Sequence, residues 1–237
     1  MRQSVSKSGR MLLFLGIGAM LASCRQSAPV STMLISDTAA MPPASPIARP
    51  SAPAPDLLAL IAAPQTVADR IVNGAKQEIL RGVTYDAGDY PQGRVPDCKG
   101  ACTDVVIRSL KTAGYDLQTL IHEDMSRHFA LYPKDWGLSG PSIGIDHRRT
   151  GNQKVFFRRH GKALPLATTG AAREPWQPGD LIYWELSPGV HHCGVLSNAR
   201  NSQGLPLVIH NMGRATQEDC LASWKIEGHF RYPAPRS

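Results

Sequence analysis

The sequence predicts an α+β domain in which helices come first and an antiparallel sheet follows. Between residues 66 and 161, apolar residues recur at the three- and four-residue spacing of helices. From residue 180 onward they form short β-like runs bounded by turn residues. A group of helices followed by a group of strands is typical of α+β folds, because strands alternating with helices would instead indicate a parallel sheet.

Capping residues set the limits of the predicted helices. Thr66 and Asp69 form a capping-box-like start for the first helix, and Asp116 and Asn152 can cap the third and fourth. The second begins at Cys102, where a polar, glycine-containing loop leads into an apolar-periodic segment. The predicted helices cover residues 66–82, 102–113, 116–132 and 152–161.

Two of the predicted strands carry histidines. The strands cover residues 180–186, 191–197, 205–211 and 224–232, and turn-forming residues between the second and third predict a hairpin. If Asn198 pairs with Gly204, His192 lies directly opposite His210, with Cβ atoms about 5 Å apart. A one-residue slip would change the partners and place Asn211 in that role instead.

The N-terminal segment has the form of an export signal. Three basic residues precede an apolar run over 11–22 that is too short to span a bilayer. The run ends in LASC, which resembles the bacterial lipobox and implies cleavage before Cys24 and lipidation of that cysteine. We therefore expect a lipoprotein signal peptide over 1–23. The alternative is an ordinary signal peptide with a chance cysteine.

The segment after the predicted anchor is interpreted as a tether. Residues 24–65 are rich in Ala, Pro and Ser and precede a domain spanning 66–237. Acyl chains on Cys24 would hold the protein stably at a membrane. By resemblance to lipoprotein sorting signals, Arg25 in place of an aspartate favours the outer membrane. The predicted location is the bacterial cell envelope, with the domain facing the periplasm.

The charge of the chain argues against nucleic acid as a partner. The 237 residues carry a formal net charge of +7, part of which lies in the predicted signal peptide. The sequence has no basic run with interleaved aromatic residues and no recognisable nucleic-acid motif. A weakly basic surface suits an anionic polymer or an anionic lipid surface. We expect a monomer that needs no cofactor.

The cysteine at the start of the second predicted helix is the candidate nucleophile. A thiol at a helix N-terminus faces the positive end of the helix dipole, which favours the thiolate. With Cys102 as nucleophile, His192 as base and His210 as the group that orients the base, the chain has the parts of a thiol hydrolase. The competing interpretation is a half-buried structural cysteine near satisfied polar histidines.

Two other arrangements of these residues are possible. A disulfide between Cys102 and either Cys98 or Cys193 would switch the activity off. The remaining cysteine, Cys220, lies further along the chain. A metal centre could use the two strand histidines together with His191 and Cys193. Adjacent strand residues point to opposite faces, however, so these ligands do not converge easily.

The chain resembles the NlpC-type papain-like cysteine peptidases. The matching features are Tyr85 upstream of the cysteine, Cys102 at a helix start, the PGD turn at 178–180, the strand HCGV at 192–195 and IHN at 209–211. More closely, residues 66–232 resemble domain of unknown function family 1287, a lineage of that superfamily. The motifs shared with the lineage are VTYD at 83–86, CTDVVIR at 102–108, HEDM at 122–125 and IDHRR at 145–149.

This resemblance implies a papain-like fold and a thiol amidase or peptidase that acts on cell-wall peptide. It makes Cys102 the nucleophile, His192 the base and His210 its orienter. The Cys102 backbone N–H, with the Tyr85 hydroxyl, would then stabilise the oxyanion. The chain departs from the common NlpC pattern, because it has ACTD where Asp-Cys-Ser-Gly is usual and Cys193 where an aliphatic residue is usual.

One polar cluster, residues 146–149, has no place in that triad. Arg148 in this cluster could hold a carboxylate of a stem peptide through a bidentate pair. The alternative is a loop held by an internal Asp–Arg pair. Tyr85, Asp104 and Arg148 are therefore the candidates for oxyanion or substrate binding.

The predicted function is hydrolysis of an amide bond in peptidoglycan through an acyl-enzyme, by a lipid-anchored cysteine amidase or peptidase. Its partners are then peptidoglycan or its peptide fragments, and the membrane that holds the anchor. Two alternatives remain. One is a catalytically silent wall-binding or partner-binding lipoprotein on the same fold, and the other is a thiol acyl or peptidyl transferase.

Overall fold

A computed structural model describes residues 66–135, 137–167 and 176–234. Within these ranges the α-helices are α1 (Val67–Leu80), α2 (Cys102–Thr112), α3 (Leu117–His128) and α4 (Thr150–His160). The 3-10 turns are η2 (Pro91–Gly93), η3 (Phe129–Leu131) and η4 (Asp146–Arg148). The strands are β1 (Thr84–Tyr85), β2 (Lys99–Gly100), β3 (Lys162–Ala163), β4 (Leu181–Ser187), β5 (Val190–Arg200), β6 (Pro206–Asn211), β7 (Ala215–Glu218) and β8 (Lys225–Arg231). The predicted signal peptide, tether and lipidated Cys24 lie outside the described residues.

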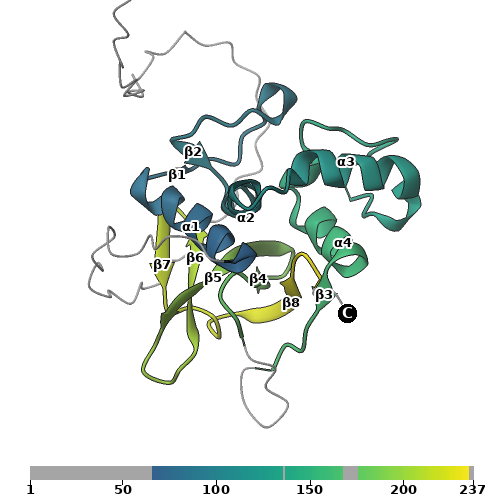
Figure 1. Ribbon diagram of the computed structural model, residues 1–237. Helices are drawn as coiled ribbons and strands as arrows, with labels where there is room; N and C mark the ends of the chain where they lie inside the picture. The colour runs from purple at the N-terminus through teal and green to yellow at the C-terminus, as the bar shows by residue number, and fades with distance from the viewer. Residues whose placement is uncertain (1–65, 136, 168–175, 235–237) are drawn as a thin grey trace, which may run out of the picture. The chain divides into compact units, whose positions relative to one another are not determined.

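Most of the strands in the described ranges join one antiparallel sheet, in the order β3-β8-β4-β5-β6-β7 (Figure 1). A separate parallel pair of strands, β1 and β2, lies immediately before α2. The predicted α+β organisation, with helices first and an antiparallel sheet after them, is confirmed. Strand β7 and the two-residue strands β1, β2 and β3 were not predicted.

Local hydrogen bonds explain where the helices start. The Thr66 hydroxyl accepts from the Asp69 amide at 3.1 Å and the Asp69 carboxylate accepts from the Thr66 amide at 2.9 Å, which confirms the predicted capping box. Asp116 caps α3 as predicted. Helix α4 begins at Thr150, two residues before the predicted cap. The reason is that the buried Asn152 side chain donates to the Asp146 carbonyl at 3.0 Å instead of capping the helix.

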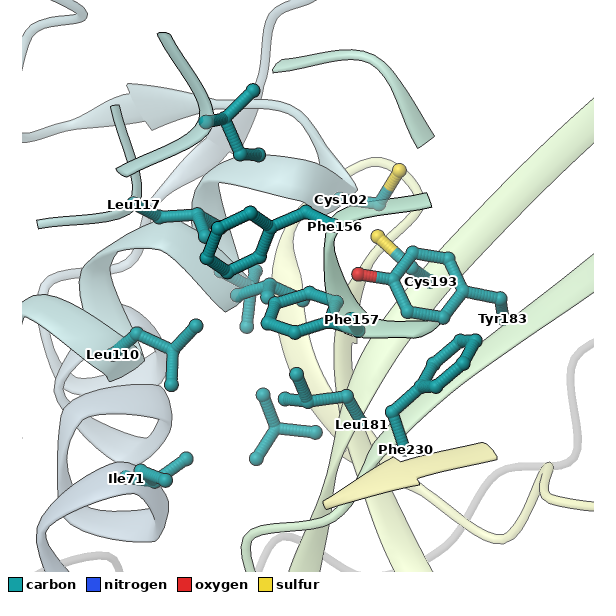
Figure 2. Close-up of a cluster of buried hydrophobic side chains, with 14 of the residues drawn as sticks. Ile71, Cys102, Leu110, Leu117, Phe156, Phe157, Leu181, Tyr183, Cys193 and Phe230 are labelled. Carbon is teal, nitrogen blue, oxygen red and sulfur yellow. The ribbon is translucent and has the colours of Figure 1, made fainter. Parts of the chain in front are cut away.

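Two buried clusters occupy the two faces of the sheet. Tyr183 and Cys193 face the helices and pack with apolar residues of α1, α2 and α4 (Figure 2). Trp184, the next residue after Tyr183, belongs to the second cluster on the other face. Helix α2 contributes Val105, Val106 and Leu110 to the first cluster, all fully buried. Each such side chain stabilises the fold by about 1.5–3 kcal/mol, and together they hold α2 against β5.

The register of the β5–β6 hairpin differs from the predicted one. Leu196 pairs with Val208, and a bulge follows before the hairpin turn. The predicted pairing of Asn198 with Gly204 was therefore wrong. The turn closes later because the Asn201 side-chain oxygen accepts from the amides of Gln203 (3.0 Å) and Leu205 (2.9 Å).

This correction preserves the face on which the two histidines lie. Relative to the predicted pairing, the observed register next to the histidines is shifted by two residues, which is one full repeat of a strand. His192 and His210 consequently stay on the same face as diagonal neighbours.

No helix among the residues that the structure describes is long and apolar enough to cross a membrane.

Candidate active site

The candidate nucleophile is the first residue of α2. The helix begins there because the Asp104 carboxylate accepts a hydrogen bond from the Ala101 amide at 2.7 Å, at the third position of the helix. Cys102 is a free cysteine and is 6% exposed. Its own amide belongs to the first helical turn, whose N–H groups have no partner within the helix. These amides and the helix dipole stabilise negative charge at the sulfur.

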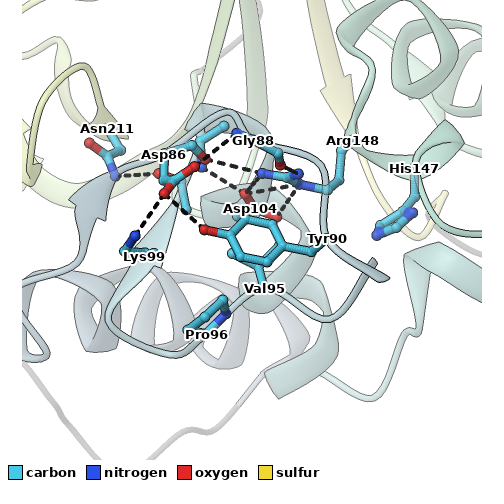
Figure 3. A network of polar contacts seen from close by, with 12 residues as sticks. Asp86, Gly88, Tyr90, Val95, Pro96, Lys99, Asp104, His147, Arg148 and Asn211 are labelled. Carbon is cyan, nitrogen blue, oxygen red and sulfur yellow. Dashed lines mark hydrogen bonds and ion pairs between the residues drawn. The ribbon is translucent and has the colours of Figure 1, made fainter. Parts of the chain in front are cut away.

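A buried ion pair holds the start of α2 in place. Arg148 Nη2 lies 2.9 Å from Asp104 Oδ2, and Arg148 Nε donates to Asp104 Oδ1 at 3.1 Å. The same guanidinium donates to the Asp86 carbonyl at 3.1 Å and to the Gly88 carbonyl (Figure 3). The pair therefore joins the helix start to the loop after β1 and to the turn η4.

The acid that pairs with Arg148 is thus Asp104, which lies outside the cluster of residues 146–149. The internal Asp–Arg pair that was the alternative for this cluster is formed by Asp146 and Arg149, 3.5 Å apart. The predicted substrate-binding roles of Asp104 and Arg148 remain predictions. Their observed contacts assign them the positioning of Cys102.

The two strand histidines are in direct contact. His192 Nε2 lies 2.9 Å from His210 Nδ1, and both side chains are almost fully buried. Trp184 stacks on the His192 ring, with 5.8 Å between ring centroids and 17° between planes. The His210 ring also packs against Trp184, with 73° between the ring planes. Burial between these rings restricts both imidazoles to one orientation, as a base and its orienting partner require.

The Cys102 sulfur contacts groups of β5. The side chain of Cys193, the side chain of His192 and the Cys193 amide all interact with it, so groups from both faces of the strand reach one sulfur. Figure 2 shows the side chains of Cys102 and Cys193 next to each other. The hydrogen bond from Cys193 and the interaction with His192 hold the pKa of Cys102 well below its usual value, although burial opposes them. Burial raises the pKa of Cys193, so Cys102 is the thiolate of the pair.

Cys102 opens onto a cavity of about 280 Å³. Residues around it include Tyr85, Arg148, Arg149 and His191. Tyr85 is 46% exposed, and burial of its ring is the main reason that its pKa is raised, so its hydroxyl stays protonated and can donate. A larger cavity, of about 460 Å³, is lined by Asp104 but not by Cys102. His192 and His210 line neither of these two cavities. We place the chemistry in the smaller cavity because the reactive sulfur faces it.

Sequence comparison assigns the family. Residues 72–232 match the family described as Domain of unknown function (DUF1287). The chain belongs to this family. The DUF1287 chain is also similar to the uncharacterized protein YijF of Escherichia coli (strain K12), with 44% identity over 167 residues, which cover 68% of this chain and 80% of that protein. Cys102, His192 and His210 all lie within the matched region.

Several of the contacts considered as alternatives are not made in the described part of the DUF1287 chain. Asn211, the alternative third group, donates from its side chain to the Gly100 carbonyl at 2.8 Å and accepts from the Gly213 amide at 3.1 Å. It therefore ties β6 to β2 and does not orient the base. Cys102, Cys193 and Cys220 are free, so neither disulfide considered for Cys102 is formed. Among the described residues, no group of three or more potential ligands could hold a metal ion.

Sequence reasoning missed two neighbours of the histidines. Trp184 was predicted only as part of a strand. An aromatic residue on a strand near His192 could have indicated that its ring packs on the imidazole. Glu218 lies on the unpredicted strand β7, 3.5 Å from His210. The position of β7 depends on pairing with β6, which the residue pattern of that segment did not indicate.

Proposed function

We propose that this DUF1287 protein is a thiol amide hydrolase with a papain-like fold of the NlpC type. The observation that supports it best is a free cysteine at a helix N-terminus whose sulfur interacts with an imidazole, while a second buried imidazole holds the first at 2.9 Å. Nucleophile, base and orienting group come from α2, β5 and β6, respectively. This is the division of roles that thiol hydrolases use.

The reaction follows from these positions. The Cys102 thiolate attacks the carbonyl carbon of the amide, and the carbonyl electron pair moves to oxygen. The Cys102 amide and the Tyr85 hydroxyl donate hydrogen bonds to this oxyanion. Protonated His192 gives its proton to the leaving nitrogen as the C–N bond breaks, which leaves a thioester on Cys102. His192 then takes a proton from water, which attacks the thioester and releases the acid and the free cysteine.

The proposed substrate is an amide bond of peptidoglycan. The similarity of Tyr85, Cys102 at a helix start, HCGV at 192–195 and IHN at 209–211 to NlpC-type enzymes supports it, and so does the export signal read from the N-terminus. A lipid anchor on Cys24 would keep the domain beside the cell wall, within reach of a 24–65 tether. The proposed site of action is thus the periplasmic side of the outer membrane.

Digestion of purified peptidoglycan tests the proposal. Wild-type protein and Cys102→Ala are incubated with it, and released or altered fragments are analysed by mass. We expect peptide-containing fragments with the wild type and none with the variant. Wall binding without turnover, unchanged in Cys102→Ala, would contradict the hydrolase and support a binding protein. Products joined to an added amine instead of water would indicate a transferase.

A further inference from the structure

An acidic residue lies behind the orienting histidine. In the antiparallel pairing of β6 with β7, Val208 is opposite Glu218 and His210 is opposite Thr216. Because strand side chains alternate between faces, Glu218 lies on the same face as His210, one diagonal step away. Its Oε2 atom is 3.5 Å from His210 Nε2. The carboxylate is thus placed at the ring nitrogen of His210 that His192 does not contact.

The contact is electrostatic. At 3.5 Å it is longer than the 2.7–3.2 Å of an N–H···O hydrogen bond, and among the described residues His210 Nε2 has no hydrogen-bond partner. His210 is 1% exposed at the side chain, whereas Glu218 is 24% exposed. The carboxylate therefore retains access to water, while its field acts on a ring that water does not reach.

The position of one proton on His210 decides what His192 can do. The 2.9 Å contact joins His192 Nε2 to His210 Nδ1, so one of these two atoms must carry the hydrogen. If His210 is protonated at Nε2, its Nδ1 accepts, and His192 carries its hydrogen at Nε2. His192 Nδ1 then has a free electron pair for the Cys102 proton. If His210 is protonated at Nδ1 instead, neutral His192 carries its hydrogen at Nδ1 and cannot accept there.

We propose that Glu218 is a positioning residue that selects the working tautomer of His210, so that the chain of groups is Cys102, His192, His210 and Glu218. A negative charge beside Nε2 favours the hydrogen at that atom and disfavours it at Nδ1. The same charge stabilises the imidazolium of His192 when Cys102 is ionised, through the intervening ring. This inference rests on the proposed function for its kinetic consequence only, because the tautomers exist with or without substrate.

The groups around His210 leave Glu218 as the charged neighbour to vary. In the described part of the chain, His210 faces the titratable His192 on β5 and Glu218 on β7, and Trp184 of β4 packs on its edge. Trp184 carries no charge and His192 is the base itself. Glu218→Gln removes the charge and keeps the shape, whereas Glu218→Asp keeps the charge.

Two measurements without substrate test the proposal. The first is 15N NMR of the histidine rings at neutral pH, and the second is the rate of Cys102 alkylation by iodoacetamide as a function of pH. Wild-type protein should carry the His210 hydrogen at Nε2. Glu218→Gln should show hydrogen at Nδ1 and alkylate Cys102 with a profile shifted to higher pH. Glu218→Asp should restore most of the wild-type signals.

Glu185→Gln is the matched control, because Glu185 forms an ion pair with Lys225 on β8 and lies opposite His191, not His192 or His210, in the strand pairing. It should change neither readout. Unchanged tautomers and an unchanged alkylation profile in a folded Glu218→Gln protein would overturn the proposal. So would equal effects of Glu185→Gln. Equal thermal unfolding temperatures establish that the variants are folded.

The kinetic arm separates this inference from the proposed function. On peptidoglycan, Glu218→Gln should lower kcat by about ten-fold with KM unchanged, less than the 10²–10⁴-fold loss expected without the base. If the wild type releases no fragments but the tautomer shift is seen, the hydrolase proposal fails and the role of Glu218 stands. If fragments are released and the tautomer does not shift in Glu218→Gln, the role of Glu218 fails and the hydrolase proposal stands.

Discussion

His192 Nε2 lies 2.9 Å from His210 Nδ1, although the two residues are not opposite each other in the β5–β6 register. Extending the pairing of Val195 with Ile209 puts Gly194 opposite His210. A Cβ at Gly194 would lie 2.8 Å from the Ile209 carbonyl oxygen and 3.2 Å from the His210 Cβ. The absence of a side chain at Gly194 therefore gives the His210 ring its place across β5.

Gly194→Ala should disturb the histidine pair. The added methyl group meets backbone at 2.8 Å, so the strands must shift, at a cost of about 1–3 kcal/mol in unfolding free energy. We also expect slower alkylation of Cys102 at neutral pH. Chemical denaturation and the alkylation rate measure the two effects. Gly204→Ala in the turn between β5 and β6 is a control for alkylation, because its Cβ would meet nothing within 4 Å, although its φ of +76° makes it costly for stability. Normal alkylation in a folded Gly194→Ala protein would contradict the argument.

The two adjacent histidines of β5 should differ sharply in function. His192→Ala removes the proposed base and should lower kcat/KM by about 10²–10⁴-fold. His191 also lines the cavity, but its Nδ1 lies 3.0 Å from Glu227 Oε2. His191→Ala is therefore the comparison variant. This imidazole pairs with Glu227 and not with His210, so its loss should lower kcat/KM much less than the loss of His192. A larger loss with His191→Ala than with His192→Ala would show that the base was assigned to the wrong histidine.

The helices and the position of Cys102 at a helix start could be predicted because they depend on local chemistry. Thr66 and Asp116 cap their helices within three residues, and such contacts can be read from spacing. The hairpin register could not be predicted, because hydrogen bonds to the Asn201 side chain place the turn later in the chain than the pattern of turn residues indicated. The pairing of Asp104 with Arg148 joins residues 44 positions apart, and only the folded chain shows which acid an arginine meets.

Cys193 should tune the acidity of the nucleophile. Its hydrogen bond is the largest cause of the lowered pKa of Cys102, ahead of the interaction with His192. In Cys193→Val the pKa of Cys102 should rise, so its thiolate forms at higher pH and the acid limb of the alkylation profile moves up. Absorbance of the thiolate near 240 nm gives the same titration. Cys220→Val, in the cluster on the other face, should leave the profile unchanged. An unshifted limb in Cys193→Val would rule out this contribution.

Breaking the Asp104–Arg148 pair should destabilise the fold strongly. Both side chains are at most 5% exposed, so Arg148→Met leaves a buried carboxylate without its partner, which costs about 3–5 kcal/mol. The double variant Asp104→Asn/Arg148→Met should recover part of this loss, because no charge stays buried. The surface pair Glu123–Arg127, more than half exposed on both sides, should contribute less than about 1 kcal/mol. Denaturant midpoints measure all three, and a small effect of Arg148→Met would contradict a positioning role for the pair.

His147 should make the protein acid-sensitive. Burial lowers its pKa to about 4 from 6.5, and its Nδ1 is buried without a hydrogen-bond partner in the described structure. Between these two values the unfolded chain binds a proton that the folded chain does not, so the unfolding free energy falls as pH falls from 6.5 toward 4. From pH 7 to pH 5 this amounts to about 2 kcal/mol. Between pH 7 and pH 5, His147→Gln should therefore lose about 2 kcal/mol less unfolding free energy than the wild type, whatever its stability at pH 7. Equal losses in the two proteins, measured by denaturant unfolding, would show that other groups cause the acid sensitivity.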